Sequence, residues 1–224
     1  MSRADGTGEA GRSGRVLAEL VSGYGRTYAE EAGIRLKDTP QPLYRLLVLA
    51  VLLSARIRAS VAVAAARALH ESGLDTARRT AGSDWQDRVD ALGRGGYRRY
   101  DERTATQLGD GAELLSERWG GDLRRMRAEA DGDVDALRRL LREVPGLGPA
   151  GADIFLREVQ RVWPEVAPYL DGKALSGAER LGLPKDPGRL LDLAGDTEPA
   201  VLAAALVRAA LDKQVSEDSL RRAA

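Results

Sequence analysis

The sequence VPGLG (residues 144–148) predicts a tight glycine turn between two helical segments. Its residue types suggest a site that binds an anion through the backbone. Proline presets the φ angle of a turn, and the glycines allow positive φ and close backbone approach. Pro149 suits the first position of a helix, so unpaired backbone N–H groups collect at that N-terminus. Such amides bind anions, and a nucleic-acid phosphate fits them. A plain corner between two helices is the alternative interpretation.

The segments that position this turn carry apolar residues at helical spacing on both sides of it. The first stripe is Val134, Leu137, Leu140 and Leu141, and the second is Ala152, Phe155, Leu156, Val159, Val162 and Trp163. We therefore expect a helix-hairpin-helix over about residues 133–163. Helical periodicity continues along nearly the whole chain from Arg15 onward, whereas β-branched runs of period two are absent. The sequence predicts an all-α fold.

Length and composition predict the domain organisation. The first segment, residues 1–14, is small, polar and glycine-rich, and we expect a disordered arm there. Residues 15–224 are long enough to bury a core and predict a single helical domain built from two lobes. The helices expected from periodicity are 15–32, 42–55, 59–72, 84–92, 98–118, 133–143, 149–163, 172–182, 187–194, 198–212 and 216–222.

Composition excludes several classes of chemistry. The chain has no cysteine, which removes disulfides, thiolate zinc sites and iron–sulfur clusters, and His70 is its only histidine. Lys plus Arg and Asp plus Glu are both 34, so nucleic-acid binding would need a local basic face. No signal peptide is visible, and the longest apolar run, residues 46–53, is too short to span a bilayer. We expect a soluble cytoplasmic protein without membrane contact.

Four segments, in order, resemble the endonuclease III-like helix-hairpin-helix (HhH-GPD) superfamily of DNA glycosylases. VPGLGPAGADIFL (144–156) is similar to the family's hairpin pattern Leu-Pro-Gly-Val-Gly-x-x-Thr-Ala. The other three are PLYRLLVLAVLLSARIRASVAVAAARAL (42–69), GGYRRYDERTATQLGDGAELLSERWGG (95–121) and YLDGKALSGAERLGLP (169–184). The resemblance covers roughly residues 30–212 and implies a two-lobed helical fold with a cleft between the lobes.

The resemblance assigns the chemistry to Asp171, which matches an aspartate that follows the hairpin in the family. Its implied role is to stabilise the oxocarbenium-like sugar of a flipped-out nucleotide and to activate or orient the attacking water. Asp171 also stands where the N-cap of the helix expected over 172–182 would be, and the two roles are compatible.

Departures from the family pattern narrow the expected activity. Ala150 occupies the position of the lysine that forms a Schiff base in bifunctional members, so no lyase activity is expected there. Lys173 stands where the family usually has histidine and is interpreted as an exposed helix residue, with a displaced amine nucleophile as the alternative. The family's four cluster cysteines are missing, so we expect no iron–sulfur cluster, no other metal and no cofactor. A monovalent cation at the hairpin is compatible with the pattern.

The resemblance and the local charge together predict which residues contact DNA. Arg56 follows the Leu-Leu-Ser-Ala motif, where the family often inserts a glutamine into DNA, and Arg58 lies beside it; a solvated arginine at a helix end is the alternative. Residues 94–103, RGGYRRYDER, hold four arginines against two acids and could follow a strand by charge and stacking. The predicted DNA-binding residues are Arg56, Arg58, Tyr97, Arg98, Arg99, Val144, Gly146, Leu147, Gly148, Ala150 and Gly151.

The expected function is therefore a monofunctional DNA glycosylase of base-excision repair. It would act as a nucleoid-associated monomer on double-stranded DNA carrying a damaged base, with alkylated bases favoured on chemical grounds. A catalytically inactive helix-hairpin-helix DNA-binding protein is the alternative, because Gly172, Lys173 and Ala174 depart from the family after the aspartate. A helical protein-interaction module without a DNA role is a third interpretation, favoured only by the near-zero net charge.

Overall fold

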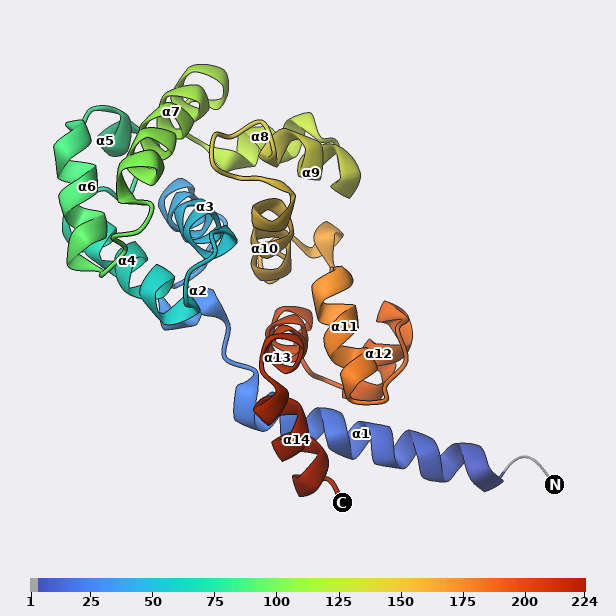
Figure 1. Cartoon of the computed structure of the whole chain (residues 1–224). Helices are drawn as coiled ribbons and strands as arrows, with labels where there is room; N and C mark the ends of the chain where they lie inside the picture. Colours follow the sequence, from blue (N-terminus) through green and yellow to red (C-terminus); the bar gives the residue numbers. More distant parts are fainter. Residues whose placement is uncertain (1–3) are drawn as a thin grey trace. The chain divides into compact units, whose positions relative to one another are not determined.

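The computed structural model describes residues 4–224, with side chains from residue 11 onward. The described residues form helices, turns and loops without any strand, which confirms the all-α prediction. The chain divides into two compact units, shown in Figure 1. Unit 1 combines Met1–Thr27 with Ala167–Ala224, and unit 2 is Tyr28–Val166. The two-lobed domain over residues 15–224 stays a prediction.

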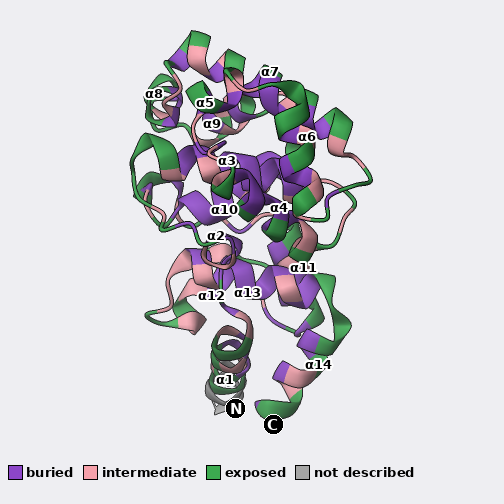
Figure 2. Ribbon diagram, turned by 90° about the vertical axis from the view of Figure 1, so that its left-hand side faces the viewer, coloured by how far each residue is buried: buried purple, intermediate pink, exposed green. Residues whose placement is uncertain are grey.

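Unit 2 is built around one buried helix. It contains α2 (Tyr28–Glu31), α3 (Pro40–Ser54), α4 (Ala59–Glu71), α5 (Ala77–Ala81), α6 (Trp85–Arg94), α7 (Asp101–Trp119), α8 (Leu123–Glu129), α9 (Val134–Leu141), α10 (Pro149–Val159) and the 3₁₀ turn η1 (Pro164–Val166). Helix α3 is buried along most of its length (Figure 2), and from Leu46 to Leu53 it is apolar on every side. A helix that is hydrophobic all round belongs in a core, and α4 and α10 pack against it.

A buried arginine joins three helices of unit 2. Arg88 on α6 donates from Nε to the carbonyl of Ala105 at 2.9 Å, and from Nη1 to the carbonyls of Thr80 at 3.2 Å and Ser83 at 2.8 Å. The guanidinium reaches α7 because Gly109 leaves room: a Cβ there would lie 2.7 Å from Arg88 Nη2. These bonds satisfy a buried charged donor and fix α5, α6 and α7 relative to each other.

Unit 1 packs its helices around α13. It contains α1 (Ala4–Tyr24), α11 (Gly172–Arg180), α12 (Pro187–Ala194), α13 (Pro199–Leu211) and α14 (Lys213–Arg222). The core joins Val16, Leu17 and Leu20 of α1 to the apolar faces of α11 and α13. Helix α11 approaches α13 closely at Gly177, where a Cβ would lie 1.9 Å from the Leu206 carbonyl oxygen. Only glycine fits this crossing.

Several boundaries differ from the prediction. Residues 4–14, expected to belong to a disordered arm, form the first turns of α1, while residues 1–3 lie outside the described residues. Once the core contacts of α1 fix its later turns, adding residues toward the N-terminus costs little because propagation is cheaper than nucleation. The expected helix 15–32 is interrupted after Tyr24, and the expected helix 149–163 ends at Val159. The short helices α5 and α8 were not predicted.

Across the described residues, no helix combines the length and the apolarity needed to cross a membrane.

Candidate nucleic-acid interface

The hairpin between α9 and α10 has the turn geometry expected from its glycines. The Leu147 N–H donates to the Val144 carbonyl at 3.0 Å and closes the turn. Gly146 has φ +83°, and a Cβ there would also lie 3.1 Å from Val51 of α3. A side chain at this position would be strained by its backbone and crowded by its neighbour. Gly146 is therefore required by the conformation.

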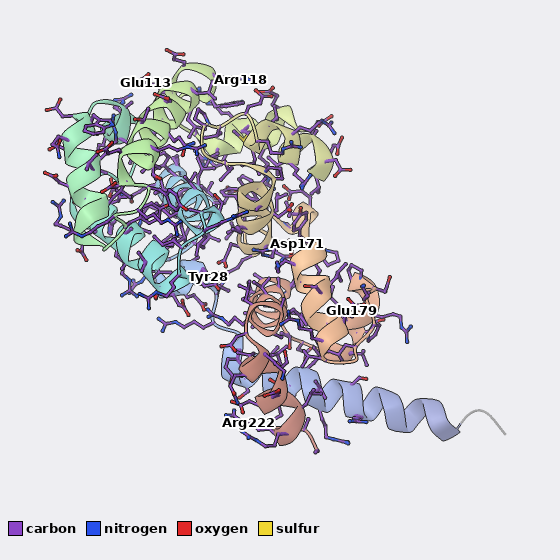
Figure 3. The ribbon with its side chains drawn as sticks, in the orientation of Figure 1. Tyr28, Glu113, Arg118, Asp171, Glu179 and Arg222 are labelled. Atoms are coloured by element: carbon purple, nitrogen blue, oxygen red, sulfur yellow. The ribbon has the colours of Figure 1, made fainter. Side chains whose placement is uncertain are left out.

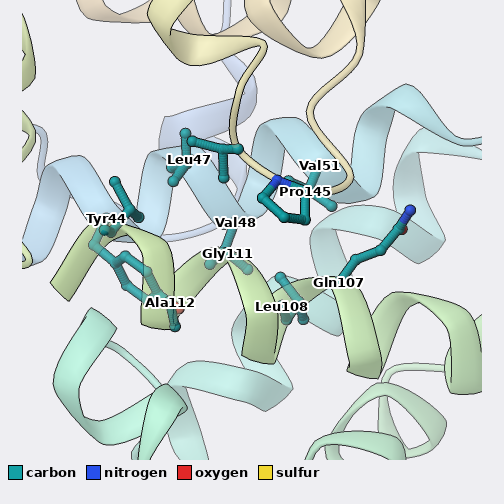
Figure 4. A pocket seen from close by; sticks show the side chains of 11 residues that line it. Tyr44, Leu47, Val48, Val51, Gln107, Leu108, Gly111, Ala112 and Pro145 are labelled. Atoms are coloured by element: carbon teal, nitrogen blue, oxygen red, sulfur yellow. The ribbon is translucent and has the colours of Figure 1, made fainter. Parts of the chain in front are cut away.

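Two side chains anchor the hairpin in unit 2. Val144 and Leu147 are only 3% and 1% exposed. Gly151 lets α10 approach this anchor, since a Cβ there would lie 2.9 Å from Leu147 Cδ1 and 3.5 Å from Ser54 Cβ. Figure 4 shows the crevice in which Pro145 lies against α3 and α7; its volume of about 10 Å³ holds at most one water. The side chains of Val144 and Leu147 thus position the turn, and contact with a ligand is left to the main chain.

The N-terminus of α10 offers backbone donors. Gly148 is the N-cap, Pro149 is the first helical residue, and no side chain caps this end. Within residues 4–224, the N–H groups of Gly148 and Ala150 have no hydrogen-bond acceptor, and both residues are exposed. Helix N-termini carry a partial positive charge, so these amides can bind an anion.

A pocket of about 310 Å³ lies beside the hairpin, entirely within unit 2. The hairpin contributes Gly146, the end of α3 contributes Ser54, and α7 contributes Gln107. Its remaining lining residues are Val51, Ala55, Arg56, Tyr97, Tyr100, Arg103 and Thr104. None of these residues is acidic, and two are arginines. The structure thus brings the hairpin, Arg56 and the start of α7 together around one basic hollow.

The arginines of this pocket are available for an external anion. Arg56 and Arg103 are exposed, and among the described residues neither forms an ion pair. Other arginines of unit 2 are engaged: Arg118 with Glu129, Arg127 with Asp38, and Arg138 with Asp153. In a chain of zero net charge, unpaired cations around one pocket provide the local basic face that phosphate binding needs.

Gln107 was not predicted as a site residue, and Arg103 was predicted only as part of the basic stretch 94–103. With Tyr100, which precedes α7, they lie at spacing i, i+3 and i+7, and all three line the pocket. The spacing was visible in the sequence. Only the tertiary structure shows that this face of α7 lines the pocket and is accessible to solvent.

The prediction that Tyr97 stacks on DNA is wrong. Tyr97 lines the pocket but is only 1% exposed, so its ring is packed into unit 2 and offers too little accessible surface for a base to stack on. Burial raises the pKa of the Tyr97 hydroxyl, and a hydrogen bond with Thr104 acts in the opposite direction. Tyr100 is the half-buried aromatic residue of the pocket, with the Arg99 guanidinium 5.2 Å from its ring centroid.

The remaining predicted arginines are exposed but do not line the pocket. Arg98 and Arg99 lie in the loop before α7. Arg58 is the N-cap of α4, and its carbonyl accepts from the N–H groups of Val61 and Ala62. These three side chains remain candidates for flanking phosphate contacts.

Asp171 immediately precedes α11 in unit 1 as its N-cap residue (Figure 3). Its Oδ1 accepts a hydrogen bond from the Ala174 N–H at 3.2 Å, which confirms the predicted N-cap. The side chain is half-buried, and Lys173 beside it is exposed. Ala150, the residue at the family's lysine position, is exposed on the first turn of α10. Its methyl group offers no amine nucleophile.

Comparison with protein-family models, with curated proteins and with solved structures finds no match for this chain.

Proposed function

We propose that this chain binds double-stranded DNA and acts on it as a monofunctional DNA glycosylase with the HhH-GPD fold, its two units forming lobes on either side of a cleft. The observation that supports DNA binding best is the joint presence of exposed, unpartnered amides at Gly148 and Ala150 and of unpaired arginines at the neighbouring pocket. A phosphodiester backbone presents repeated anions to both features. Main-chain amides would fix the strand, while Arg56 and Arg103 would neutralise phosphates.

Asp171 is the residue we assign to the chemistry. In the proposed reaction a water oxygen attacks C1′ of the flipped nucleotide, the N-glycosidic bond breaks, and the base leaves with the bonding electrons. The carboxylate would stabilise the positive charge that develops on the sugar and accept a proton from the water. No amine lies at position 150, so a covalent Schiff base is not part of this scheme.

The damaged base that suits this arrangement is a cationic alkylated purine. Such a base already carries the positive charge that acid catalysis would otherwise supply, so it leaves without a protonated general acid. A site with a single carboxylate is sufficient for that substrate class.

A catalytically inactive DNA-binding protein is the second candidate. The observation in its favour is that Asp171 Oδ1 already accepts the Ala174 N–H, a structural role that alone could explain this residue. The hairpin and its basic pocket would serve such a protein equally well.

Substitution of Asp171 by asparagine separates the two candidates. Asparagine caps helices as well as aspartate does, so Asp171→Asn keeps α11 intact while it removes the carboxylate. Wild type and variant are incubated with duplexes carrying alkylated, deaminated or oxidised bases, and abasic sites are then cleaved with hot alkali. Cleavage by wild type that is lost in the variant supports the glycosylase. Binding without release of any base by the wild type supports the inactive protein.

A further inference from the structure

A second basic cavity lies at the other end of α3 from the hairpin. Its volume is about 620 Å³, and its lining is formed by the loop before α3, the first turns of α3 and one residue before α5. These residues are Gly33, Arg35, Lys37, Thr39, Pro40, Gln41, Pro42, Arg45 and Thr76. Three of them are cationic and none is acidic. The two linings share no residue, and between Arg45 and Val51 the axis of α3 rises by about 9 Å, so the cavity is a distinct site.

The chain pattern explains why the cations gather here. Ile34 is buried and Leu36 is half-buried, whereas Arg35 and Lys37 are exposed, as alternation along a loop predicts. The two basic side chains therefore share the outer side of the loop. Arg45 joins them from the second turn of α3, where its Nη2 donates to the Gly33 carbonyl at 3.4 Å.

The nearby carboxylates of Asp38 and Asp75 already have partners other than the cavity's cations. Asp38 accepts from Trp163 Nε1 at 2.9 Å and pairs with Arg127 at 3.0 Å. Asp75 accepts from Gln41 Nε2 at 2.6 Å and from Arg79 Nη1 at 2.9 Å.

The cations of the cavity lack such partners. In the described part of the chain, Arg35 and Lys37 pair with no carboxylate. Arg45 is partly desolvated, since burial lowers its pKa while Asp75 acts in the opposite direction. A multivalent anion in the cavity would compensate that lost hydration and would be met by two guanidinium groups and one ammonium group.

We infer that this cavity is a phosphate-binding site separate from the hairpin. Arginine forks match phosphate oxygens, and the cavity has the volume of a nucleotide site. The phosphate could be part of a DNA backbone or of a free polyphosphate ligand. Phosphate binding here does not depend on glycosylase activity.

Calorimetric titration with inorganic tripolyphosphate tests the site directly. The test variant is Arg35→Gln/Lys37→Gln, which changes only exposed side chains, and a second variant adds Arg45→Gln. The charge-matched control is Arg12→Gln/Arg15→Gln, two exposed arginines of unit 1. We expect the double test variant to bind about 25-fold more weakly than wild type, roughly fivefold per cation at contact distance in water, and the control to bind as wild type does. Absent binding by wild type, or equal binding by test and control variants, would overturn the inference.

Two further arms identify the source of the phosphate. The first arm measures binding to a duplex of about 30 base pairs, roughly three turns. If the cavity binds the DNA backbone, the triple variant should lower the slope of log DNA affinity against log salt by up to about 2.7, about 0.9 for each of the three cations. An unchanged slope together with weakened tripolyphosphate binding supports a free polyphosphate ligand. Tighter binding of a polyglutamate peptide than of tripolyphosphate, lost in the test variants, would replace phosphate by an acidic protein segment and refute the inference.

Discussion

Removing the two unpaired arginines of the hairpin pocket is the sharpest test of DNA binding by unit 2. Arg56 and Arg103 line the pocket, are exposed and have no ion-pair partner among the described residues. In the variant Arg56→Gln/Arg103→Gln, two fewer phosphates would be neutralised. Each phosphate contact contributes about 0.9 to the slope of log affinity against log salt, so we expect the slope to become shallower by about 1.8. Between about 50 and 200 mM salt, the variant would then lose about twelvefold less affinity than wild type.

Fluorescence anisotropy of a labelled duplex, titrated at four or so salt concentrations, measures this slope. The control is Arg79→Gln/Arg118→Gln, which removes two arginines that already pair with Asp75 and Glu129. This control has the same net charge as the test variant, so a general charge effect would change both slopes equally. Equal slopes in wild type and in the Arg56/Arg103 variant would refute phosphate contact at this pocket, provided that both melt at the same temperature.

Four further predictions concern the hairpin and stability. Gly146→Ala should weaken DNA binding and lower stability by about 1 kcal/mol or more, because φ is +83° and Val51 crowds the Cβ; urea unfolding and anisotropy measure the two effects. Gly177→Ala should destabilise by about 3 kcal/mol through overpacking against α13, and a gain of stability, the usual result of this change in a helix, would contradict the close crossing. Arg88→Met should cost about 3 kcal/mol in urea unfolding, since it leaves buried carbonyls without a donor; an unchanged midpoint would show that the network is dispensable. Burial raises the pKa of the Tyr44 hydroxyl in the folded chain above its unfolded pKa of about 10, so the stability that this group contributes is complete below about pH 10 and is lost as pH rises toward the folded pKa. Tyr44→Phe should therefore lose less unfolding free energy than wild type as pH rises above 10 or so. Parallel pH profiles of the two proteins would argue against this burial effect.

The sequence determined those features that depend on local chemistry. Helical periodicity gave the all-α class, and the order of proline and glycine in residues 144–149 predicted a turn that leads into a helix N-terminus. The short polar side chain before a helical segment predicted the N-cap at Asp171. Each of these features is set by neighbours within a few residues, so a linear pattern carries it.

Tertiary packing decided which side chains are available to a ligand. Tyr97 and Tyr100 have the same type, lie three residues apart and both line the pocket, yet Tyr97 is only 1% exposed and Tyr100 is half-buried. Arg56 and Arg127 have the same charge, but Arg127 reaches Asp38 across a separation of 89 residues and Arg56 has no such partner in the described chain. Burial and ion pairing depend on which helices meet: α10 packs against α3, and residues of α3, α7 and the hairpin that are far apart in sequence line one pocket. For that reason the hairpin could be predicted from its residues, whereas the basic pockets at the two ends of α3 required the structure.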